Sequence, residues 1–261
     1  TASMADLRLG QVGMRFSEDL APEPISSGSG FHGVPAWRPP GASVSFITRG
    51  DSVLVVWEAP ASGAPPRRLD FGEGRGIRDH TWSSDGEWLV YRTEDQAEGN
   101  GDILAVRPGI DTAPRVIAGS DAEELSPAVS PDGRWVAYSS DKSGRHEVYV
   151  APFPDPGGIE RVVSLDGGRH PSWNPRGGEL FYLDGSDNMV AVPVPPGPTF
   201  SPGAPRVLFP AADFVLRSFD RDYDPTPDGE RFLMVEGGRG PTQIVVVFGF
   251  DEELRRRVGG R

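Results

Sequence analysis

One short sequence template recurs five times along the 261-residue chain. Each copy opens with an aromatic or apolar residue, passes through a short polar turn that ends in glycine, and leads into a strand of alternating apolar residues. The copies occupy residues 37–41, 82–86, 129–133, 173–177 and 225–229, and their closing glycines are 45, 47, 44 and 52 residues apart. The residue nine places after the first is bulky in every copy: Phe46, Tyr91, Tyr138, Tyr182 and Met234. Self-similarity at this period indicates a repeat architecture in which each copy is one supersecondary unit.

The residues of each copy predict a small antiparallel sheet. The turn glycine tolerates the positive φ that a tight hairpin requires, so the turn joins a first strand to a second. A third strand is predicted at residues 53–57, 103–107, 147–151, 189–194 and 244–250. A short fourth strand is predicted at 68–69, 114–117, 161–163 and 205–208, and the fifth copy lacks one. Four strands per repeat, packed face to face around an axis, are the plan of an all-β protein of the β-propeller class.

The missing strand of the fifth copy predicts how the ring of blades closes. Residues 251–261 run from acidic to basic, which suits the dipole of a short C-terminal helix or tail. A strand from the N-terminus, at residues 7–9 or 12–16, is predicted to pair with the last blade and cover its open edge. We therefore predict five blades of four strands in a single domain of residues 4–250, or six blades if residues 5–34 form a degenerate blade.

Composition narrows the class of protein. The chain holds 34 Gly and 27 Pro, which favours many short strands over helices. Its formal net charge of −12 disfavours nucleic acid, because phosphate binding needs a basic surface. The lack of Cys excludes disulfides, thiol nucleophiles and cysteine-ligated zinc. No apolar run approaches the roughly 20 residues of a membrane-spanning helix, so we expect no membrane insertion, and we expect a monomer.

The first residues bear on the cellular compartment. Residues 1–3, ahead of Met4, are typical of a remnant of cloning, and no signal-peptide pattern follows them. If Met4 is the native start, we expect a cytoplasmic protein. If the chain was excised from a membrane-anchored sensor, we expect an extracytoplasmic one.

Aligning the five copies brings a set of polar residues to one place. Three residues before the first template residue stand Asp79, His170 and Asp222, with Ser126 and Val34 in the other two copies. Arginine precedes each of the first three, at Arg78, Arg169 and Arg221. In a propeller these positions begin the innermost strand, so residues distant in sequence are predicted to converge at one mouth of the central channel. The three arginines are candidate ligand-binding residues.

Acids and histidines at the same mouth predict a candidate metal site. Asp220, Asp222 and Asp224 alternate and therefore share one face of a strand. Their oxygens suit a hard divalent cation such as calcium, and a histidine would admit zinc or manganese. The full candidate set is Asp79, His80, Glu124, His170, Asp220, Asp222 and Asp224. In the alternative interpretation, the arginines and acids pair with one another as structural ion pairs or are simply exposed to solvent.

One repeat also resembles a known family. Residues 126–141, SPAVSPDGRWVAYSSD, and residues 147–154, EVYVAPFP, resemble the TolB-type, WD-like propeller repeat. The resemblance covers residues 35–250. From about residue 120, including residues 199–203 and 252–256, the chain is similar to the C-terminal propeller region of bacterial serine/threonine kinases. The lysine-bearing strand motif and the His-Arg-Asp loop of the kinase domain are absent from this sequence. The resemblance implies a propeller that binds partners or senses ligands, and it brings no catalytic motif.

Three functions remain open on these residues. The first is a non-enzymatic binding or sensory propeller that recognises a protein or small ligand at the channel mouth. The second is a metal-dependent hydrolase, in which a bound cation activates water against an ester, lactone or phosphoester. The third is a scaffold that assembles with copies of itself.

Overall fold

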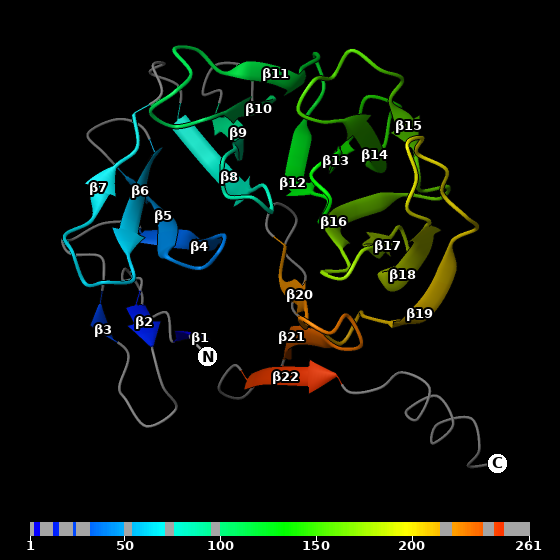
Figure 1. The fold of residues 1–261 in the computed structure, drawn as a ribbon. Helices are drawn as coiled ribbons and strands as arrows, with labels where there is room; N and C mark the ends of the chain where they lie inside the picture. Colours follow the sequence, from blue (N-terminus) through cyan, green and yellow to red (C-terminus); the bar gives the residue numbers. More distant parts are fainter. Residues whose placement is uncertain are drawn as a thin grey trace. The chain divides into compact units, whose positions relative to one another are not determined.

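The computed structural model describes residues 3–5, 13–15, 23–24, 32–49, 54–70, 76–94, 100–214, 221–236 and 243–247. Within these ranges every regular element is a β-strand, and the strands form six separate sheets (Figure 1). None of the described residues belongs to a helix with the length and apolar character needed to cross a membrane. The chain forms two compact units, residues 1–116 and residues 117–261.

The first unit begins with three sheets in sequence order. The first contains β1 (Ser3–Ala5), β2 (Gly13–Arg15) and β3 (Glu23–Pro24). The second contains β4 (His32–Arg38), β5 (Ser43–Arg49), β6 (Leu54–Pro60) and β7 (Arg67–Arg68). The third contains β8 (Gly76–Trp82), β9 (Leu89–Glu94), β10 (Ile103–Val106) and β11 (Arg115–Ala118).

The second unit holds the other three sheets. One contains β12 (Glu124–Val129), β13 (Trp135–Ser140), β14 (Glu147–Pro152) and β15 (Arg161–Val162). The next contains β16 (Gly168–Trp173), β17 (Gly178–Asp184), β18 (Asn188–Val194) and β19 (Arg206–Pro210). The last contains β20 (Tyr223–Pro225), β21 (Phe232–Glu236) and β22 (Gln243–Val247). Four of the six sheets therefore have the predicted four antiparallel strands, each paired with its neighbour in sequence.

The template turns adopt the predicted hairpin conformation. The five closing glycines all have positive φ, between 68° at Gly133 and 95° at Gly41. In the second template copy the Ser83 hydroxyl accepts a hydrogen bond from the Trp88 backbone at 2.9 Å, and Ser130 accepts one from Trp135 at 3.0 Å. The hydroxyl locks the turn because it satisfies a backbone N–H that a tight hairpin leaves unpaired.

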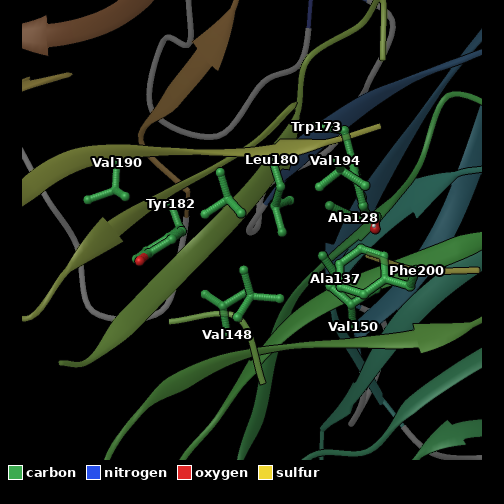
Figure 2. Packing of buried hydrophobic residues seen from close by; sticks show 12 residues of the cluster. Ala128, Ala137, Val148, Val150, Trp173, Leu180, Tyr182, Val190, Val194 and Phe200 are labelled. Carbon is green, nitrogen blue, oxygen red and sulfur yellow. Dashed lines mark hydrogen bonds between the residues drawn. The ribbon is translucent and has the colours of Figure 1, made fainter. Parts of the chain in front are cut away.

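The core lies between the faces of consecutive sheets. In the second unit, Ala137, Val148 and Val150 from one sheet pack against Leu180 and Val190 from the next (Figure 2). In the first unit a second cluster joins the sheet of β4–β7 to that of β8–β11. The bulky residues nine places into each template copy, Phe46, Tyr91, Tyr138, Tyr182 and Met234, are at most 4% exposed. These template residues therefore belong to the core.

The N-terminal strands correct one prediction. β2, which lies within the predicted closing strand at residues 12–16, pairs with β1 and β3 and is not part of the last sheet. The prediction that this segment completes the last blade is wrong, because partners nearby in sequence are available at a lower loop-closure cost. The other closing segment, residues 7–9, and the tail at 251–261 lie outside the described residues. The last sheet has three described strands. The missing fourth strand, the blade count and the single domain stay predictions.

Candidate functional site

Four of the sheets carry an irregularity at the same place in their first strand. The pairing with the second strand slips after Gly33 in β4, Ile77 in β8, Leu125 in β12 and Arg169 in β16. In β4, β12 and β16 the bulge includes the residue that alignment of the template copies selects, whereas in β8 it lies at Arg78, one residue before Asp79. A bulge of this kind bends the strand and redirects a side chain, and such bulges are frequent beside functional sites.

The backbone is strained at three of these bulges. Val34, Ser126 and His170 have φ values of 49°, 53° and 54°, and each precedes a proline. Left-handed φ is uncommon for any residue except glycine, and a β-branched valine resists it most. A following proline restricts the residue further. Strain of this type costs about 1–3 kcal/mol per residue and persists only where the surroundings enforce it.

His170 is enforced in this conformation by hydrogen bonds from three strands of the second unit. Its side chain is 1% exposed, and its Nδ1 lies 3.0 Å from the Ser126 hydroxyl. Its backbone N–H donates to the Ser139 hydroxyl at 3.1 Å, and its carbonyl accepts from the Tyr223 hydroxyl at 2.6 Å. Burial raises the pKa of Tyr223, so this hydroxyl stays protonated and remains a donor. His170 therefore connects the first strands of three consecutive sheets.

His80 makes a comparable connection in the first unit. Its Nε2 lies 2.6 Å from the Ser45 hydroxyl, which also accepts from the Trp82 indole at 2.8 Å and lies 3.2 Å from the Ala36 carbonyl. Within the described residues, the His80 Nδ1 has no hydrogen-bond partner. A proton on Nε2 satisfies the network, because Ser45 then accepts twice and donates to Ala36, leaving only a lone pair unpaired. Burial lowers the pKa of His80 to about 4, so the ring is neutral near pH 7.

The remaining candidate ligands lie in different surroundings. Glu124, at the start of β12, is 1% exposed and accepts hydrogen bonds from Ser120 at 2.7 Å and Ser140 at 3.3 Å. Asp79 and Asp222 are half-buried, and Asp224 is exposed. Asp220 lies outside the described residues. Among the described residues, no group of three or more histidines and acids is placed to hold a metal ion. The metal site stays a prediction.

Ion pairs hold the candidate arginines Arg169 and Arg221. Arg221 contacts Asp224 at 3.1 Å and donates to the Pro171 carbonyl at 3.4 Å. Arg169 pairs with Asp187, which belongs to the β17–β18 hairpin of its own sheet. Arg78 is exposed. The Arg221 pair matches the structural alternative stated above, whereas Arg169 uses an acid that the alignment of the copies did not select.

Several participants escaped the sequence analysis. Ser45 and Ser139 flank the bulky template residue of their strands, and Tyr223 follows the aligned Asp222. Arg92, at 6% exposure, is the register partner of Asp79 in the β8–β9 pair. A polar residue inside a strand that otherwise reads as buried is the signal that marks Ser45, Ser139 and Arg92.

Comparison with known proteins bears on the fold. No protein-family model matches the chain. A TolB homolog from Chlorobium luteolum is 29% identical over 146 residues, which are 48% of this chain and 33% of that relative. The chain therefore spans about a third of the length of that curated relative.

Solved structures match over more of the chain. TolB from Acinetobacter baumannii has a TM-score of 0.68 and 15% identity, covering 91% of this chain and 56% of that one. The structure of putative TolB from Agrobacterium tumefaciens has a TM-score of 0.65 and 16% identity, covering 88% of this chain and 86% of that one. At this identity the likeness concerns the fold alone, and the fold is that of the TolB-like β-propellers.

Proposed function

We propose that the chain is a non-enzymatic binding or sensory propeller, which recognises a protein or small ligand where the first strands of its sheets begin. The repeated bulge carries this proposal, since a left-handed residue before proline recurs at one aligned position in three sheets. Backbone strain held by buried hydrogen bonds gives a surface that is fixed before a ligand arrives, which lowers the entropic cost of binding. The TolB-like fold supports the same role.

The candidate arginines give this surface its chemistry. The side chains of Arg169 and Arg221 are 27% and 30% exposed, so each is oriented by an acid and still accessible. A guanidinium binds a carboxylate through two parallel hydrogen bonds. A ligand carboxylate can therefore replace Asp187 or Asp224 without leaving a cation unpaired. We infer a ligand that presents a carboxylate or similar anionic group.

The test is a thermal-shift screen of small carboxylates and acidic peptides, with calorimetry on every hit. Arg221→Ala should weaken a genuine ligand roughly tenfold or more, because it removes a charge-assisted contact. Arg206→Ala is the matched control, since Arg206 pairs with Glu179 at 2.8 Å on the outer strand β19. Equal affinity in both variants would contradict the proposal. Turnover of an ester, lactone or phosphoester that stops with a chelator would support the hydrolase instead.

A further inference from the structure

The chain contains a single lysine, Lys142, among 26 basic residues. Lys142 lies in the hairpin between β13 and β14, in the second unit. Its ammonium group contacts Tyr138, Tyr149 and Glu160, none of which belongs to the surface described above. Every other residue in that basic count is an arginine.

The surroundings combine the features that recognise an ammonium ion. The rings of Tyr138 and Tyr149 lie 5.9 Å apart with their planes 25° from parallel. The Lys142 Nζ lies 3.9 Å from the centre of the Tyr149 ring and 5.3 Å from that of Tyr138. Both distances are within the roughly 6 Å over which a cation is attracted to an aromatic face. Two aromatic rings and a carboxylate thus surround one cation.

Hydrogen bonds fix the polar side of this cluster. Lys142 pairs with the Glu160 carboxylate and donates to the Tyr138 hydroxyl at 3.1 Å. The same hydroxyl donates to Glu160. Burial, and then the Glu160 carboxylate, raise the pKa of Tyr138, so the hydroxyl keeps its proton. Glu160 is therefore positioned to neutralise a cation held by the rings.

The walls of the cluster are fixed, whereas the occupant sits on a flexible stem. Tyr138 and Tyr149 are register partners in adjacent strands, and they are 0% and 7% exposed. Glu160 immediately precedes β15, the edge strand of the same sheet. The side chains of Lys142 and Glu160 are 28% and 35% exposed, so solvent reaches the ammonium from one side. Lys142 can move out by rotating its own side chain, without any change in the sheet.

We propose that Tyr138, Tyr149 and Glu160 form a binding site for an alkylammonium group, which Lys142 fills as an internal ligand and which an external cation can occupy in its place. The external cation is either a quaternary ammonium headgroup or the side-chain ammonium of a lysine on a partner. The site uses none of the first-strand arginines, so it stands independently of the proposed carboxylate-binding surface.

The internal ligand sets the affinity to be expected. A tethered group competes at an effective concentration in the millimolar range or higher. An external cation of similar intrinsic affinity must therefore exceed this concentration to occupy most of the wild-type sites. Removing the Lys142 ammonium should strengthen binding of an external cation by roughly tenfold or more, because the site is then empty at the start.

The experiment is an NMR titration of wild type and Lys142→Ala with two probes, tetramethylammonium and N-acetyl-lysine methylamide. Chemical shifts of the two tyrosines report occupancy of the site. A third probe, neutral 3,3-dimethyl-1-butanol, has the shape of choline without its charge. Lys142→Gln provides a second uncharged variant if the alanine variant folds poorly. Melting curves establish that each variant is folded.

The expected result is saturable binding of at least one cation to Lys142→Ala, at least tenfold tighter than to wild type, and no binding of the neutral probe. The probe that binds more tightly identifies the source, quaternary headgroup or partner lysine. Adding Tyr149→Leu or Glu160→Gln to Lys142→Ala should remove the binding. Absence of saturable binding in both lysine variants, equal binding of the neutral probe, or unchanged binding after Tyr149→Leu would each overturn the proposal.

Discussion

Two junctions between neighbouring sheets are covered differently at the hairpin turn between the first and second strands. In the first unit, the turn before β9 sits directly on the turn before β5, so a Cβ added to Gly86 would lie 2.1 Å from the Pro39 carbonyl oxygen. Arg38 completes the contact, since its Nε donates to the Gly86 carbonyl at 2.8 Å and its guanidinium lies 4.4 Å over Trp82.

The junction between the sheets of β12–β15 and β16–β19 has no such contact at its turn. A Cβ added to Gly177 would meet nothing within 4 Å. The corresponding end is filled from the loop between β18 and β19, where Phe200 packs 5.3 Å from Trp135 and 6.5 Å from Trp173. Figure 2 shows the Phe200 ring beside Ala137 and Val150.

Comparing the two junctions shows which features of the structure follow from the repeated template and which depend on other residues. Both glycines have left-handed φ, 72° at Gly86 and 78° at Gly177, so the hairpin itself is common to both. What covers the hairpin depends on residues outside the shared pattern. The first copy reads Arg38-Pro39-Pro40 before its glycine, and these residues receive the next turn. The fourth copy has a long Pro- and Gly-rich loop that supplies an aromatic wedge.

The largest effect is expected at that wedge. Phe200→Ala should lower the free energy of unfolding by about 3–5 kcal/mol, because it removes a buried ring and leaves a cavity between two tryptophans. Thr199→Ala, at the exposed neighbouring position, is the control and should change stability by less than about 0.5 kcal/mol. Urea unfolding followed by tryptophan fluorescence measures both. A loss below about 1 kcal/mol at Phe200 would mean that the loop does not hold this junction.

The next effect tests the opposite junction. Gly86→Ala should cost about 3 kcal/mol, because left-handed strain and a collision with the Pro39 backbone act together. Gly177→Ala shares the strain but has open space, so it should cost about 1 kcal/mol. The difference between the two unfolding free energies isolates the contact between turns. Equal losses of unfolding free energy in the two variants would show that the turns do not make this close contact.

Sequence pattern predicted the strands well, because each depends on neighbours within a few residues. The hairpin glycines, the alternating second strands and the short outer strands follow from local chemistry. In the five template copies the described strands agree with their predicted positions to within a few residues. The pairing predicted for residues 12–16 is wrong, because more than one segment could serve as the partner strand and the sequence does not show which pairing costs less. The sequence shows Phe200 only as one apolar residue in a loop, and does not show that its ring packs between two sheets.

The candidate site was predicted in outline and not in its contacts. Alignment of the copies selected one position in each first strand. At three of these positions, Val34, Ser126 and His170, the structure has a strained backbone within a bulge. The alignment could not show that His170 would bond to Ser126, 44 residues away, or His80 to Ser45, 35 residues away. Such contacts depend on how one sheet packs against another, and no single repeat contains that information. Whether the candidate acids and histidines converge on one metal depends on the same packing between sheets, so the sequence alone does not decide it.

The third prediction concerns the buried ring of His80. The folded pKa of His80 lies near 4, below the ordinary value of 6.5, so the unfolded chain binds this proton first as pH falls. Its contribution to stability is intact above pH 6.5 and is lost as pH falls towards 4. The loss over this window is about 2–3 kcal/mol. The fall in urea midpoint between pH 7 and pH 4 should be smaller in His80→Gln than in wild type. An identical pH profile in wild type and His80→Gln would contradict the buried neutral ring.

The smallest effect is expected at the ion pair of Arg221 with Asp224, which belong to neither junction. The Asp224 side chain is 61% exposed, and solvent screens such a pair, so Asp224→Asn should change the unfolding free energy by less than about 1 kcal/mol. Arg221 also keeps its hydrogen bond to the Pro171 carbonyl.

The same variant tests the predicted metal site when melting curves are recorded with and without a chelator, beside elemental analysis of the protein. If Asp222 and Asp224 hold a cation, the chelator lowers the melting temperature of wild type and has little effect on Asp222→Asn or Asp224→Asn. If they only orient Arg221 for a ligand carboxylate, the chelator changes no melting curve, and Asp224→Asn alters ligand affinity while stability stays within that narrow limit.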